Sequence, residues 1–181
     1  MKFFFPLAIT AMLFSCNGPT KDAASTNEAK PEAASTETLS YAYVPKNHPP
    51  DNWDRGDQKN VVMVLNALKA WENNKLDECF SYFEDSVELS FDELETKLSK
   101  DSTKKFFQPQ RDNMKSYSID MEDYETVISK DKKDEWVSLW YKEKWTDAKG
   151  VTDSIFHMDD LKIVNGKIAL IDSKSRKYSK K

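Results

Sequence analysis

Two side chains of this 181-residue sequence could transfer protons near neutral pH, and these are His157 and Asp92. His157 lies in an alternating stretch that predicts a β-strand, and imidazole is the most frequent general acid or base in proteins. Asp92 directly follows a strand predicted for residues 86–91. Histidines also occupy sheets, and aspartates also begin turns, without any catalytic role. Their surroundings in the fold must decide between these two interpretations.

The sequence contains no pattern for metal or phosphate chemistry. Its 2 histidines and 2 cysteines are far apart and form no ligand pair. Residues 51–57, DNWDRGD, resemble a calcium loop, but Trp53 and Arg55 stand where oxygen ligands are required. With only 4 glycines, the chain has neither a phosphate-binding loop nor a nucleophile elbow. We therefore expect no metal and no cofactor.

Cys16 is predicted to carry lipid. Residues 1–15 have a positive start at Lys2 and an apolar run, which is too short for the about 20 residues that span a bilayer. This run ends in Leu-Phe-Ser-Cys, the form of a bacterial lipoprotein signal. We expect acyl chains such as palmitate on Cys16, holding the protein in the cell envelope, at the outer membrane or cell surface rather than the inner membrane. An ordinary signal peptide followed by an unmodified cysteine is the alternative.

The next 41 residues are predicted to lead from the lipid anchor to a folded domain. Residues 16–40 are rich in Ala, Ser, Thr, Glu and Pro, so they cannot bury a core and are expected to form a flexible tether. Residues 41–56 contain aromatic side chains and 3 prolines, which favour an extended arm that packs on the domain. Residues 57–181 form the expected domain.

The domain begins with a predicted helix, a short second helix and a strand. Apolar side chains at helical spacing mark the first helix from Val61 to Trp71, with Asp57 as its N-cap. A second helix is predicted around Cys79, on a face that is expected to be buried. Residues 86–91 alternate as a half-buried strand does. A third helix capped by Ser102 precedes candidate strands at residues 117–121, 124–129, 135–146, 151–164 and 167–172.

These elements resemble the start and the end of the nuclear-transport-factor-2-like (NTF2-like, SnoaL-like) superfamily. Residues 72–89, ENNKLDECFSYFEDSVEL, resemble its helix, polar turn, short helix and first strand, with Leu76, Asp77, Phe83 and Asp85 in the motif positions. Residues 159–172, DDLKIVNGKIALID, resemble its last hairpin. The resemblance covers residues 57–178 and implies an α+β cone. In such a cone, a strongly bent antiparallel sheet wraps around a long N-terminal helix, with two shorter helices.

The resemblance also allows a test for known chemistry, because the superfamily includes ketosteroid isomerases. An ungapped comparison puts their general base at Phe91 or Asp92, their oxyanion tyrosine near Ala67 and their protonated acid near Met158. Ala67 and Met158 cannot donate a hydrogen bond to an enolate. With these two positions unsuited, the isomerase set lacks two of its three parts. The comparison is good to about one residue, so His157 or Asp159 could still point inward.

A cone implies an inner and an outer face. We expect Trp71, Phe91, Tyr141, Phe156 and Met158 to line the inside, which either holds a small apolar molecule or is filled by its own side chains. Trp136 and Trp140 share the opposite face of their strand from Tyr141. They are expected to form a homodimer face or to be covered by the arm.

Three functional hypotheses remain open at this point. The first is a non-catalytic envelope lipoprotein that binds a small apolar ligand or a protein. The second is an isomerase, cyclase or dehydratase that uses His157 or Asp92, and the third is a structural homodimer with a filled cone. A net charge of −4, with acids and bases interspersed, argues against nucleic acid as a partner. An open cavity would argue against the third hypothesis, and an ionisable side chain inside it would favour the second.

Overall fold

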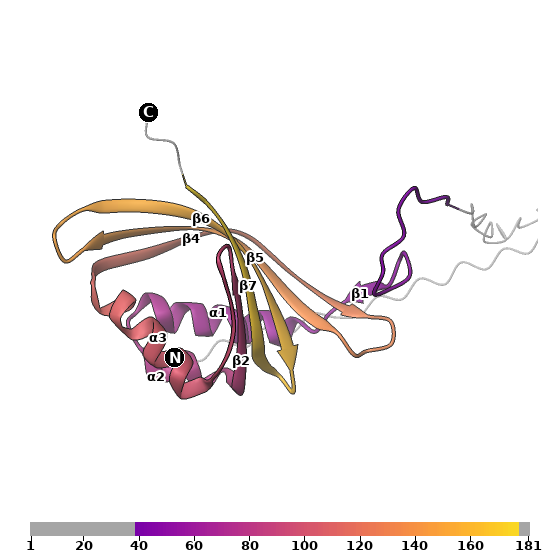
Figure 1. The fold of residues 1–181 in the computed structure, drawn as a ribbon, viewed down its shortest axis with the longest axis horizontal. Coiled ribbons are helices and arrows are strands. Elements are labelled where there is room, and N and C mark those ends of the chain that lie inside the picture. The colour runs from indigo at the N-terminus through magenta and orange to yellow at the C-terminus, as the bar shows by residue number, and fades with distance from the viewer. Residues whose placement is uncertain (1–38, 178–181) are drawn as a thin grey trace, which may run out of the picture. The chain divides into compact units, whose positions relative to one another are not determined.

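Periodic apolar side chains place three helices on one side of a curved sheet (Figure 1). The computed structural model describes residues 39–177, so the expectations for residues 1–38, including Cys16, lie outside the described residues. Residues from Tyr43 onward form one compact unit, which is described here by itself. Helix α1 (Gln58–Glu72) begins at Asp57, whose carboxylate accepts a hydrogen bond from the Lys59 amide at 2.9 Å.

The apolar face of α1 packs against the sheet and forms the core. Val61, Val64, Ala67 and Ala70 are buried on this face at helical spacing. Helix α2 (Leu76–Ser81) adds the buried Leu76, and helix α3 (Lys100–Asp112) closes the same side. Ser99, rather than the expected Ser102, caps α3, because its hydroxyl accepts the Ser102 amide hydrogen at 3.2 Å.

The sheet has seven strands in the order β1-β4-β5-β6-β7-β2-β3. Their bounds are β1 (Trp53–Arg55), β2 (Phe83–Phe91), β3 (Leu94–Ser99), β4 (Met114–Ser129), β5 (Glu135–Asp147), β6 (Thr152–Val164) and β7 (Lys167–Lys177). The sheet is mixed rather than purely antiparallel as expected, because β2 pairs with β7 in parallel. Turn signals predict only strands that are joined by hairpins, and β2 and β7 are far apart in the chain.

Two strands differ from the sequence pattern. β4 is a single strand where two were expected, since an irregularity between Met121 and Asp123 lets pairing with β5 continue. β3 was not predicted. It alternates between half-buried and exposed side chains, and its polar composition conceals this alternation.

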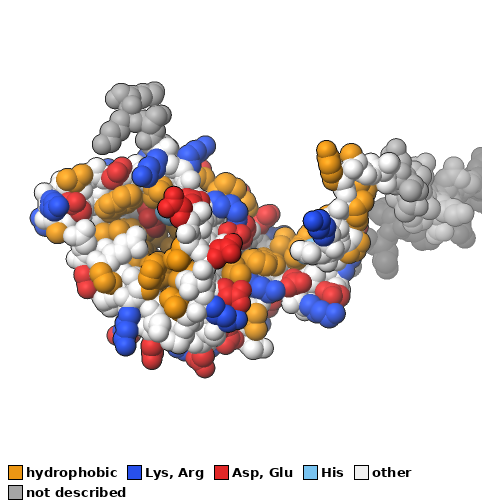
Figure 2. All heavy atoms as spheres, in the orientation of Figure 1, with side chains coloured by type: hydrophobic (Ala, Val, Ile, Leu, Met, Phe, Trp, Pro, Cys, Tyr) orange, Lys and Arg blue, Asp and Glu red, His pale blue; other side chains and the backbone are white. Residues whose placement is uncertain are grey.

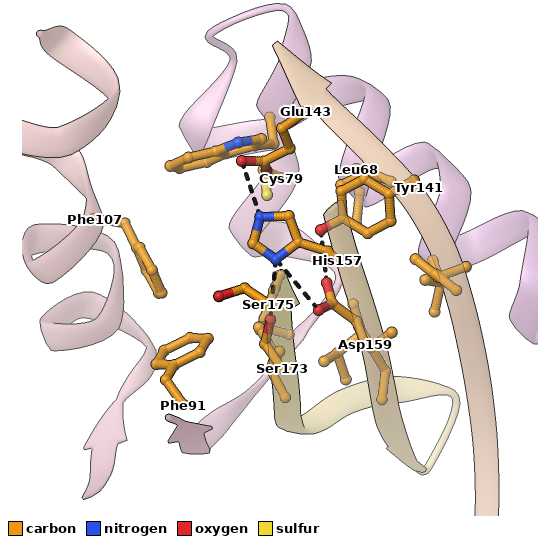
Figure 3. Close-up of a pocket in the computed structure, with 18 of the residues that line it drawn as sticks. Leu68, Cys79, Phe91, Phe107, Tyr141, Glu143, His157, Asp159, Ser173 and Ser175 are labelled. Carbon is orange, nitrogen blue, oxygen red and sulfur yellow. Dashed lines mark hydrogen bonds and ion pairs between the residues drawn. The ribbon is translucent and has the colours of Figure 1, made fainter. Parts of the chain in front are cut away.

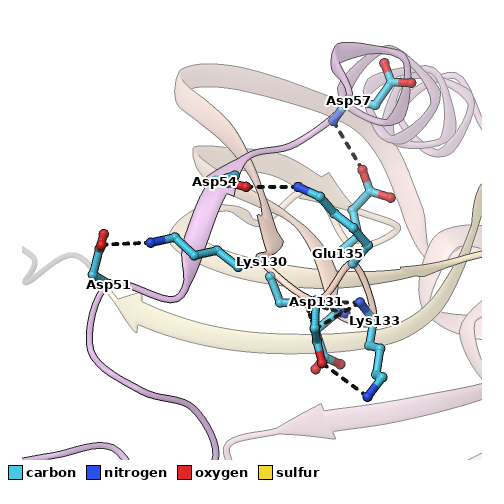
Figure 4. A network of polar contacts seen from close by, with 10 residues as sticks. Asp51, Asp54, Asp57, Lys130, Asp131, Lys133 and Glu135 are labelled. Carbon is cyan, nitrogen blue, oxygen red and sulfur yellow. Dashed lines mark hydrogen bonds and ion pairs between the residues drawn. The ribbon is translucent and has the colours of Figure 1, made fainter.

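The arm joins the sheet at its edge instead of lying over one face. β1 pairs antiparallel with β4, and Arg55 lies opposite Val127. Ion pairs from Asp51 to Lys130 at 2.8 Å and from Asp54 to Lys132 at 2.9 Å connect this region to the turn after β4 (Figure 4). Earlier in the arm, Tyr43 is 92% exposed, so the expected packing is confined to the residues around β1.

Candidate binding and acid–base site

A cavity of about 610 Å³ lies between the three helices and the concave face of the sheet. Most of its wall is apolar, and Figure 2 shows hydrophobic side chains around a hollow on this side of the molecule. The helices and β2 contribute Val64, Ala67, Leu68, Trp71, Cys79, Phe80, Phe83, Phe91, Phe106, Phe107 and Gln110. The other strands and the β2–β3 turn contribute Asp92, Glu93, Leu94, Leu139, Tyr141, Glu143, His157, Asp159, Leu161, Ile168, Ile171, Ser173 and Ser175.

Most polar side chains of the cavity gather on three neighbouring strands. His157 of β6 lies opposite Tyr141 of β5 and Ser175 of β7, and Asp159 lies opposite Ser173. Because side chains alternate along a strand, this register brings all five to the concave face. The Tyr141 and His157 rings stack with centroids 5.2 Å apart, which fixes the imidazole against a buried wall.

Each side of the imidazole meets a carboxylate, Glu143 on one side and Asp159 on the other (Figure 3), and each carboxylate accepts a hydrogen bond from a tyrosine. The Nε2 atom of His157 lies 3.2 Å from Glu143 Oε2, and the Tyr117 hydroxyl donates to Glu143 Oε1. Nδ1 lies 3.3 Å from Ser173 Oγ and 3.9 Å from Asp159 Oδ1. The Tyr141 hydroxyl donates to Asp159 Oδ2 at 2.6 Å. We call these five side chains, Tyr117, Glu143, His157, Asp159 and Tyr141, the imidazole cluster.

Burial and charge shift the protonation of the imidazole cluster. Burial opposes a charged His157, but the close contact and the charge of Glu143, aided by the charges of Asp159 and Asp92, raise the pKa of its imidazole above the ordinary value. Burial raises the pKa of the Asp159 carboxyl, and the neighbouring Ser173 and Tyr141 hydroxyls offset this only in part. Burial, together with the nearby carboxylates, raises the pKa of Tyr141 well above that of free tyrosine. The tyrosines therefore remain hydrogen-bond donors.

Two buried polar atoms of the cluster make no hydrogen bond within the described residues. They are His157 Nε2, whose contact with Glu143 is an ion pair, and Asp159 Oδ1. Asp159 as a residue is only 8% exposed. A buried carboxylate oxygen without a donor costs free energy, so this atom is open to a donor from a bound molecule.

Neither protein-family models nor curated protein sequences match this chain. Solved structures match its fold. An NTF2-like protein of unknown function from Burkholderia pseudomallei aligns with a TM-score of 0.54 and 10% identity, over 65% of this chain and 91% of its own. AusH from Aspergillus nidulans aligns with a TM-score of 0.56 and 16% identity, over 71% and 90%. An LEH-like epoxide hydrolase from M. tuberculosis aligns with 0.53 and 10%, over 66% and 84%.

The domain has the NTF2-like fold. The structural alignments establish the fold. At identities this low they say nothing about the chemistry, which must be argued from the residues of this chain. The fold expected from residues 57–178 is thus confirmed in its architecture of a curved sheet with three helices.

Three of the five side chains expected inside the NTF2-like cone line the cavity, and these are Trp71, Phe91 and Tyr141. The expectation for Phe156 and Met158 is wrong. Met158 is 44% exposed, and the Phe156 ring packs under the Arg176 guanidinium, 4.9 Å from its centroid. The sequence pattern separates Phe156 and Met158 from His157 and Asp159 correctly. It places the wrong pair inside the cone, because apolar residues were assumed to point inward.

Both acid–base candidates line the cavity. His157 lies within the imidazole cluster, and Asp92 lies in the turn between β2 and β3, where Ser175 donates to its carboxylate at 3.1 Å. Asp92 is exposed, so it borders the entrance while His157 is deeper. The ketosteroid isomerase positions at Ala67 and Met158 bear no hydrogen-bond donor, as expected. However, a tyrosine and an acid meet elsewhere in this cone, as Tyr141 and Asp159.

Glu143, Tyr117 and Ser173 were missed by the sequence analysis. One signal was available, since Glu143 shares the strand parity of Val137, Leu139 and Tyr141, which are all buried. A glutamate is normally assigned to solvent, so its parity was overlooked. Tyr117 and Ser173 could be found only from the pairing register of β4 and β7, which the sequence does not specify.

The remaining predicted features lie away from the cavity. Trp136 and Trp140 are half-buried on the opposite face of β5, with the Lys162 ammonium 5.7 Å from the Trp136 ring centroid. The homodimer stays a prediction. Within residues 39–177, no group of three or more His, Cys, Asp or Glu side chains is arranged to hold a metal ion. In the same part of the chain, no helix is both long and apolar enough to cross a bilayer.

Proposed function

We propose that this chain is a lipid-anchored envelope protein whose NTF2-like domain binds a small, largely apolar molecule. The open cavity of about 610 Å³ carries the proposal. Small-molecule sites in proteins are typically apolar clefts of about 300–1,000 Å³ with a few convergent polar groups. A cone filled by its own side chains would have no such volume, so the cavity argues against a purely structural role.

The polar end of the cavity favours a binding function over a catalytic one. Both ring nitrogens of His157 face protein oxygens of Glu143, Ser173 and Asp159. A general base needs a free nitrogen within hydrogen-bond reach of the substrate proton. Both imidazole nitrogens are turned toward protein oxygens, whereas Asp159 Oδ1 makes no hydrogen bond within the described residues and can accept one from a ligand.

The binding proposal is tested by native mass spectrometry of full-length protein extracted from membranes. We expect a co-purified small molecule in addition to the mass of acyl chains on Cys16. Ser175→Trp narrows the entrance, and it should lose the small molecule but keep the acyl mass. Ser116→Trp, an exposed serine on β4 outside the cavity wall, is the matched control and should keep both.

If wild type carries no small molecule and binds no added probe, the binding proposal fails. If Cys16→Ser retains the acyl mass that wild type carries on residues 16–40, the anchor proposal fails independently of the cavity.

A second candidate is an isomerase, cyclase or dehydratase acting through the same cavity. The observation that favours it is the position of His157, an ionisable side chain that lines the cavity between two carboxylates. General acid–base catalysis is worth about 10²–10⁴-fold in rate. If NMR of protein mixed with envelope extract detects turnover, His157→Gln should lower it by about 100-fold or more. Turnover that is unchanged in His157→Gln would remove this candidate.

A further inference from the structure

The cavity contains four carboxylates, one imidazole and no lysine or arginine among its lining residues. Glu143 and Asp159 belong to the imidazole cluster, and Asp92 and Glu93 lie in the exposed turn at the entrance. Four carboxylates thus line the cavity beside a single imidazole. The field inside the cavity is therefore negative, and low-dielectric walls strengthen it.

The buried cation Arg111 does not offset this charge. Arg111 lies behind Tyr117, with its guanidinium carbon 5.2 Å from the ring centroid, and it does not line the cavity. It donates instead to the backbone oxygens of Trp71 at 3.0 Å and Glu72 at 2.8 Å. Arg111 is thus committed to the end of α1, and an anion entering the cavity would find no arginine or lysine in its wall.

The cavity wall also presents aromatic rings to a ligand. Trp71 and Phe91 both pack edge-on against Phe107, with centroids 5.9 Å and 6.0 Å from it and interplanar angles of 78° and 89°. Because the rings are perpendicular to one another, the cavity wall presents both ring faces and ring edges. Ring faces attract cations, most strongly where water is excluded.

We propose that the cavity selects an organic cation, a protonated or quaternary amine on an apolar body. The proposal rests on the proposed function and adds the charge of the ligand to it. Asp159 Oδ1 is buried, makes no hydrogen bond within the described residues and lies 3.9 Å from His157 Nδ1, so it can still accept a hydrogen bond from a bound cation. An ammonium N–H would donate to it, whereas a quaternary amine would be held by charge and by the aromatic wall.

The test uses three probes of similar size on the full chain. Benzyltrimethylammonium carries the charge, neopentylbenzene is its neutral carbon isostere, and 3-phenylpropionate is an anion. By isothermal titration calorimetry we expect the cation to bind about tenfold or more tightly than the isostere, and the anion not to bind. Equal or tighter binding of the isostere or the anion would overturn this inference and leave the proposed function standing. Failure of all three probes to bind would overturn this inference, and it would overturn the proposed function as well if wild type also carries no co-purified small molecule.

Charge-removing variants locate the effect. Asp159→Asn should weaken the cation about tenfold and leave the neutral isostere unchanged. Asp92→Asn with Glu93→Gln alters only exposed side chains, so it guards against a folding defect and should also weaken the cation. Glu122→Gln, an exposed acid on β4 outside the cavity wall, is the matched control and should have no effect. Equal loss in Glu122→Gln, or no loss in either cavity variant, would contradict the assignment.

Discussion

At the scale of single residues, the central feature is an imidazole held between two carboxylates that are each hydrogen-bonded to a tyrosine. Glu143 and Asp159 face opposite nitrogens of His157, and Tyr117 and Tyr141 donate to them. This arrangement stabilises the imidazolium, because burial alone would disfavour it. The cluster therefore favours the charged form of His157 more than water does for a free histidine.

The raised pKa of His157 predicts how stability depends on pH. A group whose pKa is higher in the folded than in the unfolded state stabilises fully below the unfolded value, here 6.5, and loses this contribution as the pH rises through the folded value. Asp159 changes stability in the same direction, from its unfolded value of 3.8 upward. We expect the free energy of unfolding, measured with urea, to fall between pH 6 and 9.

His157→Gln removes the titrating group and should flatten this decline. Carboxylates with lowered pKa values, such as Asp54 and Asp85, act only below about pH 4 and do not enter this window. Stability that stays constant or rises between pH 6 and 9 in wild type would contradict the shift. If the free energy of unfolding of His157→Gln falls as much as that of wild type, another group causes the pH dependence.

Strand parity at the residue scale could be read from the sequence, but the face could not. Alternation grouped His157 with Asp159 and separated them from Phe156 and Met158. The polar pair nevertheless faces the cavity, which reverses the usual hydrophobic-in rule. Such a reversal is typical of a functional site, where local rules yield to ligand or catalytic requirements.

At the scale of elements, the helices and most strands follow from periodicity, whereas their pairing does not. The 3.6-residue pattern from Val61 to Trp71 predicts α1, and the Asn165-Gly166 turn predicts the β6–β7 hairpin. The parallel pairing of β2 with β7 depends on contacts between distant segments, so no local pattern announces it. β3 escaped detection because its side chains are never fully buried.

Arg111 connects helix α3 to the end of helix α1. Its guanidinium donates to the last backbone oxygens of α1, where the helix dipole is negative, and it is only 5% exposed. Arg111→Met should therefore lower the free energy of unfolding by about 3 kcal/mol, because buried carbonyls lose charged donors. Urea denaturation measures this change.

Lys115→Met is the control for Arg111→Met, since Lys115 is exposed on β4 and should change stability by less than about 0.5 kcal/mol. A loss in Arg111→Met as small as in the control would show that α1 does not need this cap.

At the scale of the whole molecule, we propose an envelope lipoprotein that presents an acidic, aromatic-walled cavity to small molecules. Lipid attachment at Cys16 would hold the domain near a membrane, and residues 16–40 would let it move relative to that surface. Homodimerisation through Trp136 and Trp140 stays a prediction at this scale, and sedimentation equilibrium of wild type against Trp140→Ser would test it. A monomeric wild-type protein would reject the dimer without affecting the cavity.

The most direct test of the cavity as the binding site uses the 5 tryptophans of the chain as reporters. Only Trp71 lines the cavity, while Trp136 and Trp140 lie on the opposite face of β5. In ¹⁵N–¹H spectra, titration with benzyltrimethylammonium, and separately with neopentylbenzene, should shift the Trp71 indole signal and leave Trp136 and Trp140 in place. Shifts confined to Trp136 and Trp140, or none at saturating probe, would contradict the account.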